Sequence, residues 1–581
     1  KDDPRKRLFE IALSSSTHSM ASTRSFQRRI ALEIEHTLQK KTYTPGIIRL
    51  LLIIFLYFCS SIAVYTWFNS YSTGLMYNTL NTSYAMRMTA RRRNWLINLH
   101  RRAMSIVLVE NEYMERYRYP DGQDYTQYCL NYIRTNLDEV DAANDVILGI
   151  LSELQEGLRN TYFKRISFSP RLPEQETLFL PMQGIIQDIV ASSIAILKRP
   201  SLTANDPDLH FIINNVNNEL QIRSEAFISA LFQHVQSINE MNTSINLAII
   251  GIYCGFCLAI VMLSAFEEKK YVSEKASFFD SLLRTNEKEC NQHAKQIRLF
   301  YKALKENNTR VDNRSKTNSN NSNKGHAKKS YRIGDFSGLY LSSYKRVLVT
   351  FLILLISIFV GFIFYNEVKN YNSSVVFLNE RLLESQKMLI YYSLLLSALY
   401  QYVGNDVGAT IKNVPVEKEI GNIIEYLKET QKFYIKYREL DPPLQNDLFE
   451  LIQGNLCNIF TNHMEPYDNC QTLIKGSITK GLFSINSFVL NTIIEAKDRY
   501  EASAKTKVDI QGVFADPDLK EVERAFVPLM RDVYMSINQR LLTEIQDRIH
   551  SVNNNTNYLN FILIIVCVLM LLIGRSEDHT S

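Results

Sequence analysis

Four long apolar runs punctuate an otherwise mixed polar and apolar chain. They are Ile47–Phe68, Leu247–Phe266, Val347–Tyr365 and Tyr558–Gly574. Each has about the 17–25 residues that a helix needs to cross ~30 Å of hydrocarbon. Arg49, near the edge of the first run, is the one charged residue among them. The pattern therefore predicts four membrane-spanning helices.

These runs divide the chain into nine segments. We expect a cytoplasmic N-terminal segment at 1–46, a first span at 47–68, a first helical ectodomain at 69–246, a second span at 247–266, a cytoplasmic helix and disordered basic linker at 267–346, a third span at 347–365, a second helical ectodomain at 366–557, a fourth span at 558–574 and a cytoplasmic tail at 575–581.

Basic residues beside the spans predict the orientation. Lys40 and Lys41 precede the first span, Lys269 and Lys270 follow the second, and Arg575 follows the fourth. Positive charge near span ends marks the cytoplasmic side. We therefore expect cytoplasmic termini and two extracellular or lumenal segments. The basic linker should contact the anionic lipids of the inner leaflet.

Both large segments between the spans have helical periodicity, which predicts an all-α fold with two tandem helical bundles. Each half follows the same order of span, bundle and span, and the residues before the second and fourth spans are similar ("LFQHVQSINEMNTSIN" and "EIQDRIHSVNNNTNYLN"). This similarity predicts a duplicated unit; a chance likeness in an asparagine-rich chain is the alternative. Prolines at 170 and 173 predict a loop, and breaks are also expected at Gly404–Pro415 and Lys505–Pro517.

Glycosylation sequons lie near the ends of each predicted ectodomain. Asn81 and Asn372 follow the first and third spans, and Asn242 and Asn554 precede the second and fourth. If these segments are extracellular or lumenal, all four asparagines are candidate glycosylation sites.

Three cysteines fall on the predicted oxidising side. Cys457 and Cys470 flank a short loop that contains Pro466, so we predict a disulfide between them. Cys129 is then unpaired. We expect a buried thiol, and a bond to another chain is the alternative.

The second predicted span carries two motifs. Gly251, Gly255 and Ala259 recur every four residues and share one helix face, which favours close packing against another helix. Cys254 and Cys257 have the spacing of redox proteins, but a strand-to-helix junction is missing there. We interpret these two cysteines as small apolar residues.

An arginine cluster stands on the predicted helix after the first span. It comprises Arg87, Arg91, Arg92, Arg93, Arg101 and Arg102. One interpretation is a patch for an anion or an acidic partner. We favour the other, a solvated face paired with acids such as Glu110 and Glu112.

Motifs of known catalytic sites are missing from the sequence. We find no glycine-rich phosphate loop, no His-Glu-x-x-His, no Gly-x-Ser-x-Gly and no paired Cys-x-x-Cys metal site. We therefore expect no catalytic residues, no cofactor and no metal. A net charge of +5 gives no reason to expect a nucleic-acid partner.

The order of span, helical bundle and span resembles the input modules of bacterial chemoreceptors. The segment "YDNCQTLIKGSITKGLFSIN" (Tyr467–Asn486) is similar to TmcB-like multi-pass membrane proteins of ciliates. This second resemblance covers about twenty residues and implies a plasma or ciliary membrane. We expect a non-enzymatic, receptor-like protein with protein partners or a homo-oligomeric state. A scaffold subunit is the alternative, and a channel or transporter subunit ranks third.

Overall fold

A computed structural model describes most of the chain. The described residues are 45–116, 124–152, 154, 156–169, 178–283, 295–299, 337–408, 416–430, 442–459 and 470–577. The predicted N-terminal segment up to residue 44 and most of the basic linker lie outside them. The chain divides into two compact units: unit 1 comprises Lys1–Val64, Gly251–Phe359 and Met570–Ser581, and unit 2 comprises Tyr65–Ile250 and Val360–Leu569.

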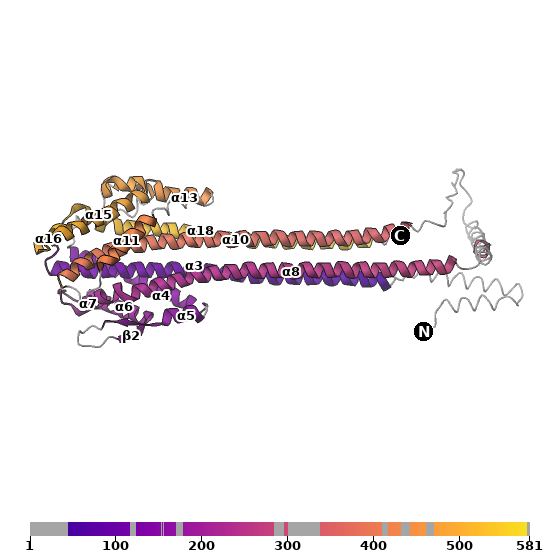
Figure 1. Ribbon diagram of the computed structural model, residues 1–581, viewed down its shortest axis with the longest axis horizontal. Coiled ribbons are helices and arrows are strands. Elements are labelled where there is room, and N and C mark those ends of the chain that lie inside the picture. The colour runs from indigo at the N-terminus through magenta and orange to yellow at the C-terminus, as the bar shows by residue number, and fades with distance from the viewer. Residues whose placement is uncertain are drawn as a thin grey trace, which may run out of the picture. The chain divides into compact units, whose positions relative to one another are not determined.

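The all-α class is confirmed. The long helices are α3 (Pro45–Glu110), α8 (Gln221–Leu283), α10 (Ser337–Asp406) and α18 (Val527–Glu577) (Figure 1). Proline at the first position of α3 costs no hydrogen bond, because the first amide of a helix has no partner within it. By length and composition, the helical run Pro207–Lys270 is the one helix among the described residues that qualifies as a possible membrane span.

The first half of unit 2 places short elements between α3 and α8. They are α4 (Tyr125–Leu151), α5 (Glu156–Phe163), β1 (Arg165–Phe168), β2 (Leu178–Pro181), α6 (Met182–Lys198), α7 (Pro207–Asn215) and the π-helix η2 (Val216–Leu220). Helix α4 buries one stripe, which includes Cys129, Ile133 and Val140. That spacing explains why it packs as an amphipathic helix.

Strands β1 and β2 lie on either side of the predicted loop at Pro170 and Pro173, and both prolines lie outside the described residues. The strands are antiparallel, and Phe168 faces Leu178. Ile166 and Phe168 are buried while Arg165 is exposed, which is the period of two of a strand. Each strand has only four residues, which is too short for the alternation of buried and exposed positions to be recognised in the sequence.

The second half of unit 2 lies between α10 and α18. Its elements are α11 (Val416–Thr430), α13 (Pro442–Gln453), α14 (Leu456–Ile459), the 3-10 segment η5 (Cys470–Lys480), α15 (Leu482–Ala502), α16 (Lys507–Phe514), α17 (Pro517–Glu521) and the π-helix η6 (Val522–Phe526). The predicted break at Lys505–Pro517 is wrong in its middle. A capping box of Thr506 and Asp509 starts α16 there.

Helices α7 and α17 begin with the same four residues, Asp-Pro-Asp-Leu. Asp206 and Asp516 are the N-caps, and each carboxylate accepts from the backbone N–H groups two and three residues later. A π-helix follows each short helix, η2 after α7 and η6 after α17. Arg199 forms ion pairs with Asp206 and Asp208, and Arg499 forms one with Asp516.

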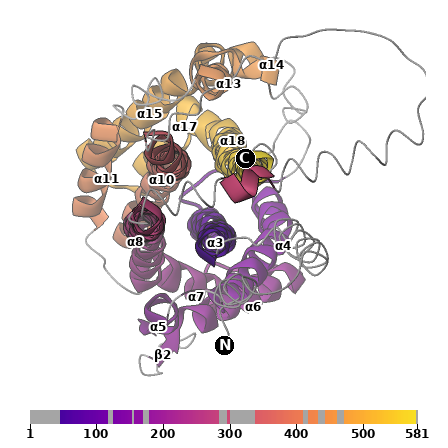
Figure 2. The same cartoon turned by 90° about the vertical axis from the view of Figure 1, so that its right-hand side faces the viewer.

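Helix α3 is the centre of unit 2. Figure 2 shows α4, α6, α7, α8, α10 and α18 arranged around it. Every residue from Arg92 to Val109 is buried, polar and apolar alike. A helix that is enclosed on all sides must find partners for its polar side chains inside the protein.

Candidate functional site: a buried arginine cluster on helix α3

The arginines singled out in the sequence have two environments. Arg87 and Arg91 are half-buried; the former donates to Gln539 Oε1 and the latter forms an ion pair with Glu139. The other four, Arg92, Arg93, Arg101 and Arg102, are buried, with at most 3% of each exposed. The interpretation as a solvated face is therefore wrong for these four, because helices enclose α3 here.

The acids expected to pair with the arginine cluster have other partners. Glu110 forms an ion pair with Arg116 (2.7 Å), and Glu112 forms one with Lys507 (2.6 Å). Both acids follow the last buried turn of α3, so they lie away from the enclosed stretch.

Glu523, on η6, is the carboxylate that meets the two innermost arginines. Its Oε1 accepts from Arg101 Nη1 at 2.9 Å, from Arg102 Nη1 at 3.0 Å and from the Tyr125 hydroxyl at 2.6 Å. Burial, followed by the negative charge of Glu523, raises the pKa of Tyr125 well above its usual range. Two cations thus share one carboxylate in the interior.

Aromatic rings cover the rest of Arg102. Its guanidinium carbon lies 4.8 Å from the ring centre of Tyr128 and 5.0 Å from that of Tyr132. Cation–π contacts of this kind are favourable when desolvated. They offset part of the charge that Glu523 leaves unbalanced.

A second contact joins α3 to α8 and α10. Arg93 donates to Gln221 Oε1 at 2.8 Å and to Glu225 Oε2 at 3.1 Å. The other oxygen of Glu225 accepts from the Tyr391 hydroxyl at 3.1 Å. Burial and then the charge of Glu225 raise the pKa of Tyr391 to about 12. The carboxylate therefore holds three long helices together.

A third, neutral contact lies at His100. Its Nδ1 is 2.8 Å from the Ser397 hydroxyl on α10 and 3.1 Å from Asn217 Nδ2 on η2. The backbone of Asn217 is not helical, with φ −87° and ψ 39°, and its amide also donates to Gln401 at 3.2 Å. Burial lowers the pKa of His100 to about 3, which keeps the imidazole neutral.

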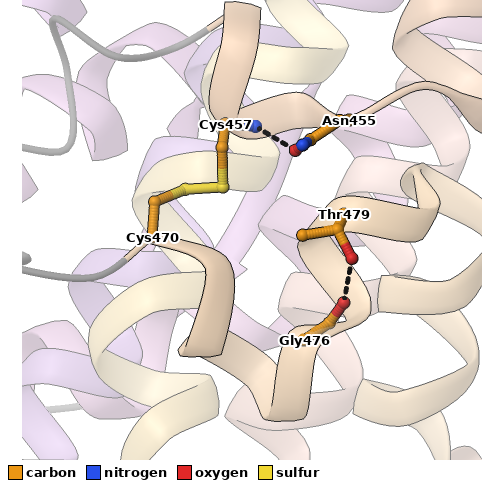
Figure 3. Close-up of a disulfide and its surroundings, with 5 residues drawn as sticks. All are labelled: Asn455, Cys457, Cys470, Gly476 and Thr479. Carbon is orange, nitrogen blue, oxygen red and sulfur yellow. Dashed lines mark hydrogen bonds between the residues drawn. A yellow bond between two sulfur atoms is a disulfide. The ribbon is translucent and has the colours of Figure 1, made fainter.

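The predicted disulfide is confirmed. Cys457 and Cys470 are bonded, with Cα atoms 5.9 Å apart (Figure 3). The bond joins α14 to the start of η5. Cys129 is a free, fully buried thiol, as expected, and burial raises its pKa to about 11.

Two of the predicted glycosylation sites conflict with the structure. Asn242 and Asn372 are buried, and Asn242 Nδ2 donates to Asn372 Oδ1 at 3.2 Å. Asn372 also donates to Thr243 Oγ1 at 2.8 Å. A glycan on either nitrogen would remove these bonds and find no room. Asn81 is half-buried, whereas Asn554 is exposed.

The small residues in unit 1 do not pack within the described part of the chain. Gly251, Gly255 and Ala259 are exposed. The opposite face carries Tyr253 and Cys257, which are buried, and the Tyr57 hydroxyl is 2.7 Å from that of Tyr253. Polar groups on this face thus make the helix contact that we had expected from the small-residue stripe.

The long-range partners of the arginines escaped sequence analysis. Glu523 is 421 positions away from Arg102 in the sequence. Ser397, the partner of His100, is 297 positions away from it. One feature of the sequence lies close to Glu523: the second Asp-Pro-Asp-Leu ends four positions before it, and each copy starts a short helix that a π-helix follows.

Comparison with protein-family models, curated proteins and solved structures finds no match. Within the described ranges, no group of three or more His, Cys, Asp or Glu residues is placed to hold a metal ion.

Proposed function

We propose that this chain is a non-enzymatic, receptor-like membrane protein in which the two helical bundles sense as one body. The observation that carries the proposal is the set of contacts within unit 2 between its two halves, through Arg101, Arg102 and His100 on one side and Glu523 and Ser397 on the other. Two bundles that are joined by buried ion pairs change conformation together, because separating them would leave a buried charge without its partner.

The proposal includes four spans, cytoplasmic termini, a plasma or ciliary membrane and a duplicated unit. The shared Asp-Pro-Asp-Leu starts of α7 and α17, each followed by a π-helix, support the duplication. The apolar runs and their basic flanks support the spans and their orientation. The bounds of α3, α8, α10 and α18 support a route for a signal, because each helix includes residues of an apolar run and of a bundle.

The experiment asks whether locking unit 2 changes unit 1. Spin labels are placed at the exposed Leu56 and Leu258, both in unit 1, in a full chain without other free cysteines. A disulfide between His100→Cys and Ser397→Cys then locks unit 2. We expect the distribution of label distances in nanodiscs to shift or narrow relative to the same labelled chain in which His100 and Ser397 are unchanged.

A matched control carries the single His100→Cys substitution and should not respond to oxidant. An unchanged distance distribution in the locked protein would contradict the receptor proposal. That result would favour a scaffold subunit, for which the exposed stripe of Gly251, Gly255 and Ala259 offers a surface for another helix.

A further inference from the structure

Arg92 is a buried cation that contacts no carboxylate among the described residues. One per cent of the residue is exposed, and its Nη1 donates to Asn144 Oδ1 and to the Tyr162 hydroxyl, both at 2.8 Å. The guanidinium carbon lies 5.5 Å from the ring centre of Tyr162. Its buried Nη2 has no hydrogen-bond partner.

The other buried arginines of unit 2 differ in this respect. Arg93 pairs with Glu225, Arg101 and Arg102 share Glu523, and Arg381 pairs with Glu384. Within the described ranges, both oxygens that accept from Arg92 are neutral. Arginine does not lose its proton in proteins, so the charge remains, and an isolated buried charge is strongly unfavourable.

The groups that contact Arg92 carry no charge. Asn144 accepts through its oxygen from Arg92, and the Gln183 oxygen accepts from the Tyr162 hydroxyl at 2.5 Å. Each amide oxygen already accepts one hydrogen bond, and the amide nitrogens, like Arg92 Nη2, can only donate. A buried guanidinium that has an unused donor and contacts no carboxylate in the described structure matches an anion with a single negative charge.

We propose that a small monovalent anion, a carboxylate or a halide, binds at Nη2 of Arg92 among α3, α4, α5 and α6. The anion supplies Arg92 with a negative charge, as Glu225 does for Arg93 and as Glu523 does for Arg101 and Arg102. Water at the same place would satisfy Nη2 but leave the charge unbalanced. This site lies within the first half of unit 2 and requires neither a signalling role nor a particular topology.

The test uses the full chain in nanodiscs at constant ionic strength. The reference buffer contains only a bulky sulfonate anion, which is replaced stepwise by chloride or by acetate. Trp95, buried one turn from Arg92, reports unfolding through its fluorescence. We expect a saturable rise in melting temperature with chloride, acetate or both, because a ligand that binds only the folded state stabilises it.

Two variants separate the site from general salt effects. Arg92→Met should lose the saturable rise, with anion affinity weaker by roughly tenfold or more. Arg91→Met, which removes the neighbouring half-buried cation, should keep it. An anion effect of equal size in parent and Arg92→Met, or no effect in the parent, would overturn the proposal.

A binding measurement covers the case in which Arg92→Met does not fold. Equilibrium dialysis of the parent with radiolabelled chloride and with radiolabelled acetate should give saturable binding of one of them. Binding of chloride alone identifies a halide site, and tighter binding of acetate identifies a carboxylate site. No saturable binding of either ion contradicts the inference, because water then occupies the place.

Discussion

Replacing Glu523 by Gln should destabilise the protein more than any other single change of charge in unit 2. The substitution keeps an acceptor oxygen of the same size but removes the only carboxylate that Arg101 and Arg102 contact in the described structure. Both arginines are fully buried, so neither charge can be solvated instead.

The expected loss follows from these contacts. Three donors lie within 3.0 Å of Glu523 Oε1, and hydrogen bonds to a charged group contribute about 1.5–3 kcal/mol each. Simple addition overestimates the effect, because Gln still accepts one or two of these bonds and the contacts are coupled. Measured losses for breaking a buried ion pair are about 3–5 kcal/mol, and we expect the free energy of unfolding to fall by that amount.

The assay is urea unfolding of the full chain in detergent, followed by the fluorescence of the buried Trp95. Glu544→Gln is the matched control, since Glu544 is partly exposed and pairs with Arg548 on the same helix. That variant should lose less than about 1 kcal/mol. A loss of this small size in Glu523→Gln as well would refute the reasoning and show that water reaches the two arginines.

Three further predictions concern other parts of unit 2. If the ectodomains are extracellular or lumenal, Asn554→Gln should reduce a glycosidase-sensitive mobility shift and leave only the part that Asn81 contributes, whereas Asn372→Gln should leave the shift unchanged. A smaller shift in the second variant would mean that the buried amide pair does not form. Replacing Cys457 and Cys470 by Ala should lower the free energy of unfolding by about 3 kcal/mol, judged from the short loop that the bond closes, and reductant should then have no further effect on the variant. The pKa of His100 falls to about 3 in the folded protein, below its unfolded value near 6.5, so the contribution of the neutral imidazole to stability is complete above pH 6.5 and is lost as the pH drops towards 3. The free energy of unfolding should fall by about 2 kcal/mol by pH 5. His100→Gln should remove that part of the pH dependence in urea titrations.

Helical periodicity in the sequence predicted the all-α class, and local patterns explain several of its elements. The stripe at Cys129, Ile133 and Val140 makes α4 amphipathic, and the prolines at 207 and 517 begin helices, as proline does at a first helical position. The pairing of Cys457 with Cys470 was also within reach, because only a short loop separates them. Such features depend on neighbours a few positions away.

The environment of the arginines lay beyond such patterns. A helix with Arg92, Arg93, Arg101 and Arg102 has the composition of a solvated surface, and only the surrounding helices make it the centre of unit 2. The carboxylate that two of these arginines share comes from η6, hundreds of residues later. Neither the hydrophobic periodicity nor the number of charged residues predicts which distant carboxylate pairs with these arginines.

The separation between Arg102 and Glu523 has a consequence for synthesis. The ribosome makes Arg102 first and its acid partner Glu523 only 421 residues later, so Arg101 and Arg102 are without their carboxylate until the second half has been made. Contacts this distant form slowly, because a long loop must close before they contribute. Two separately expressed halves, divided in the linker between α8 and α10, should therefore each be incomplete alone and should associate when made together.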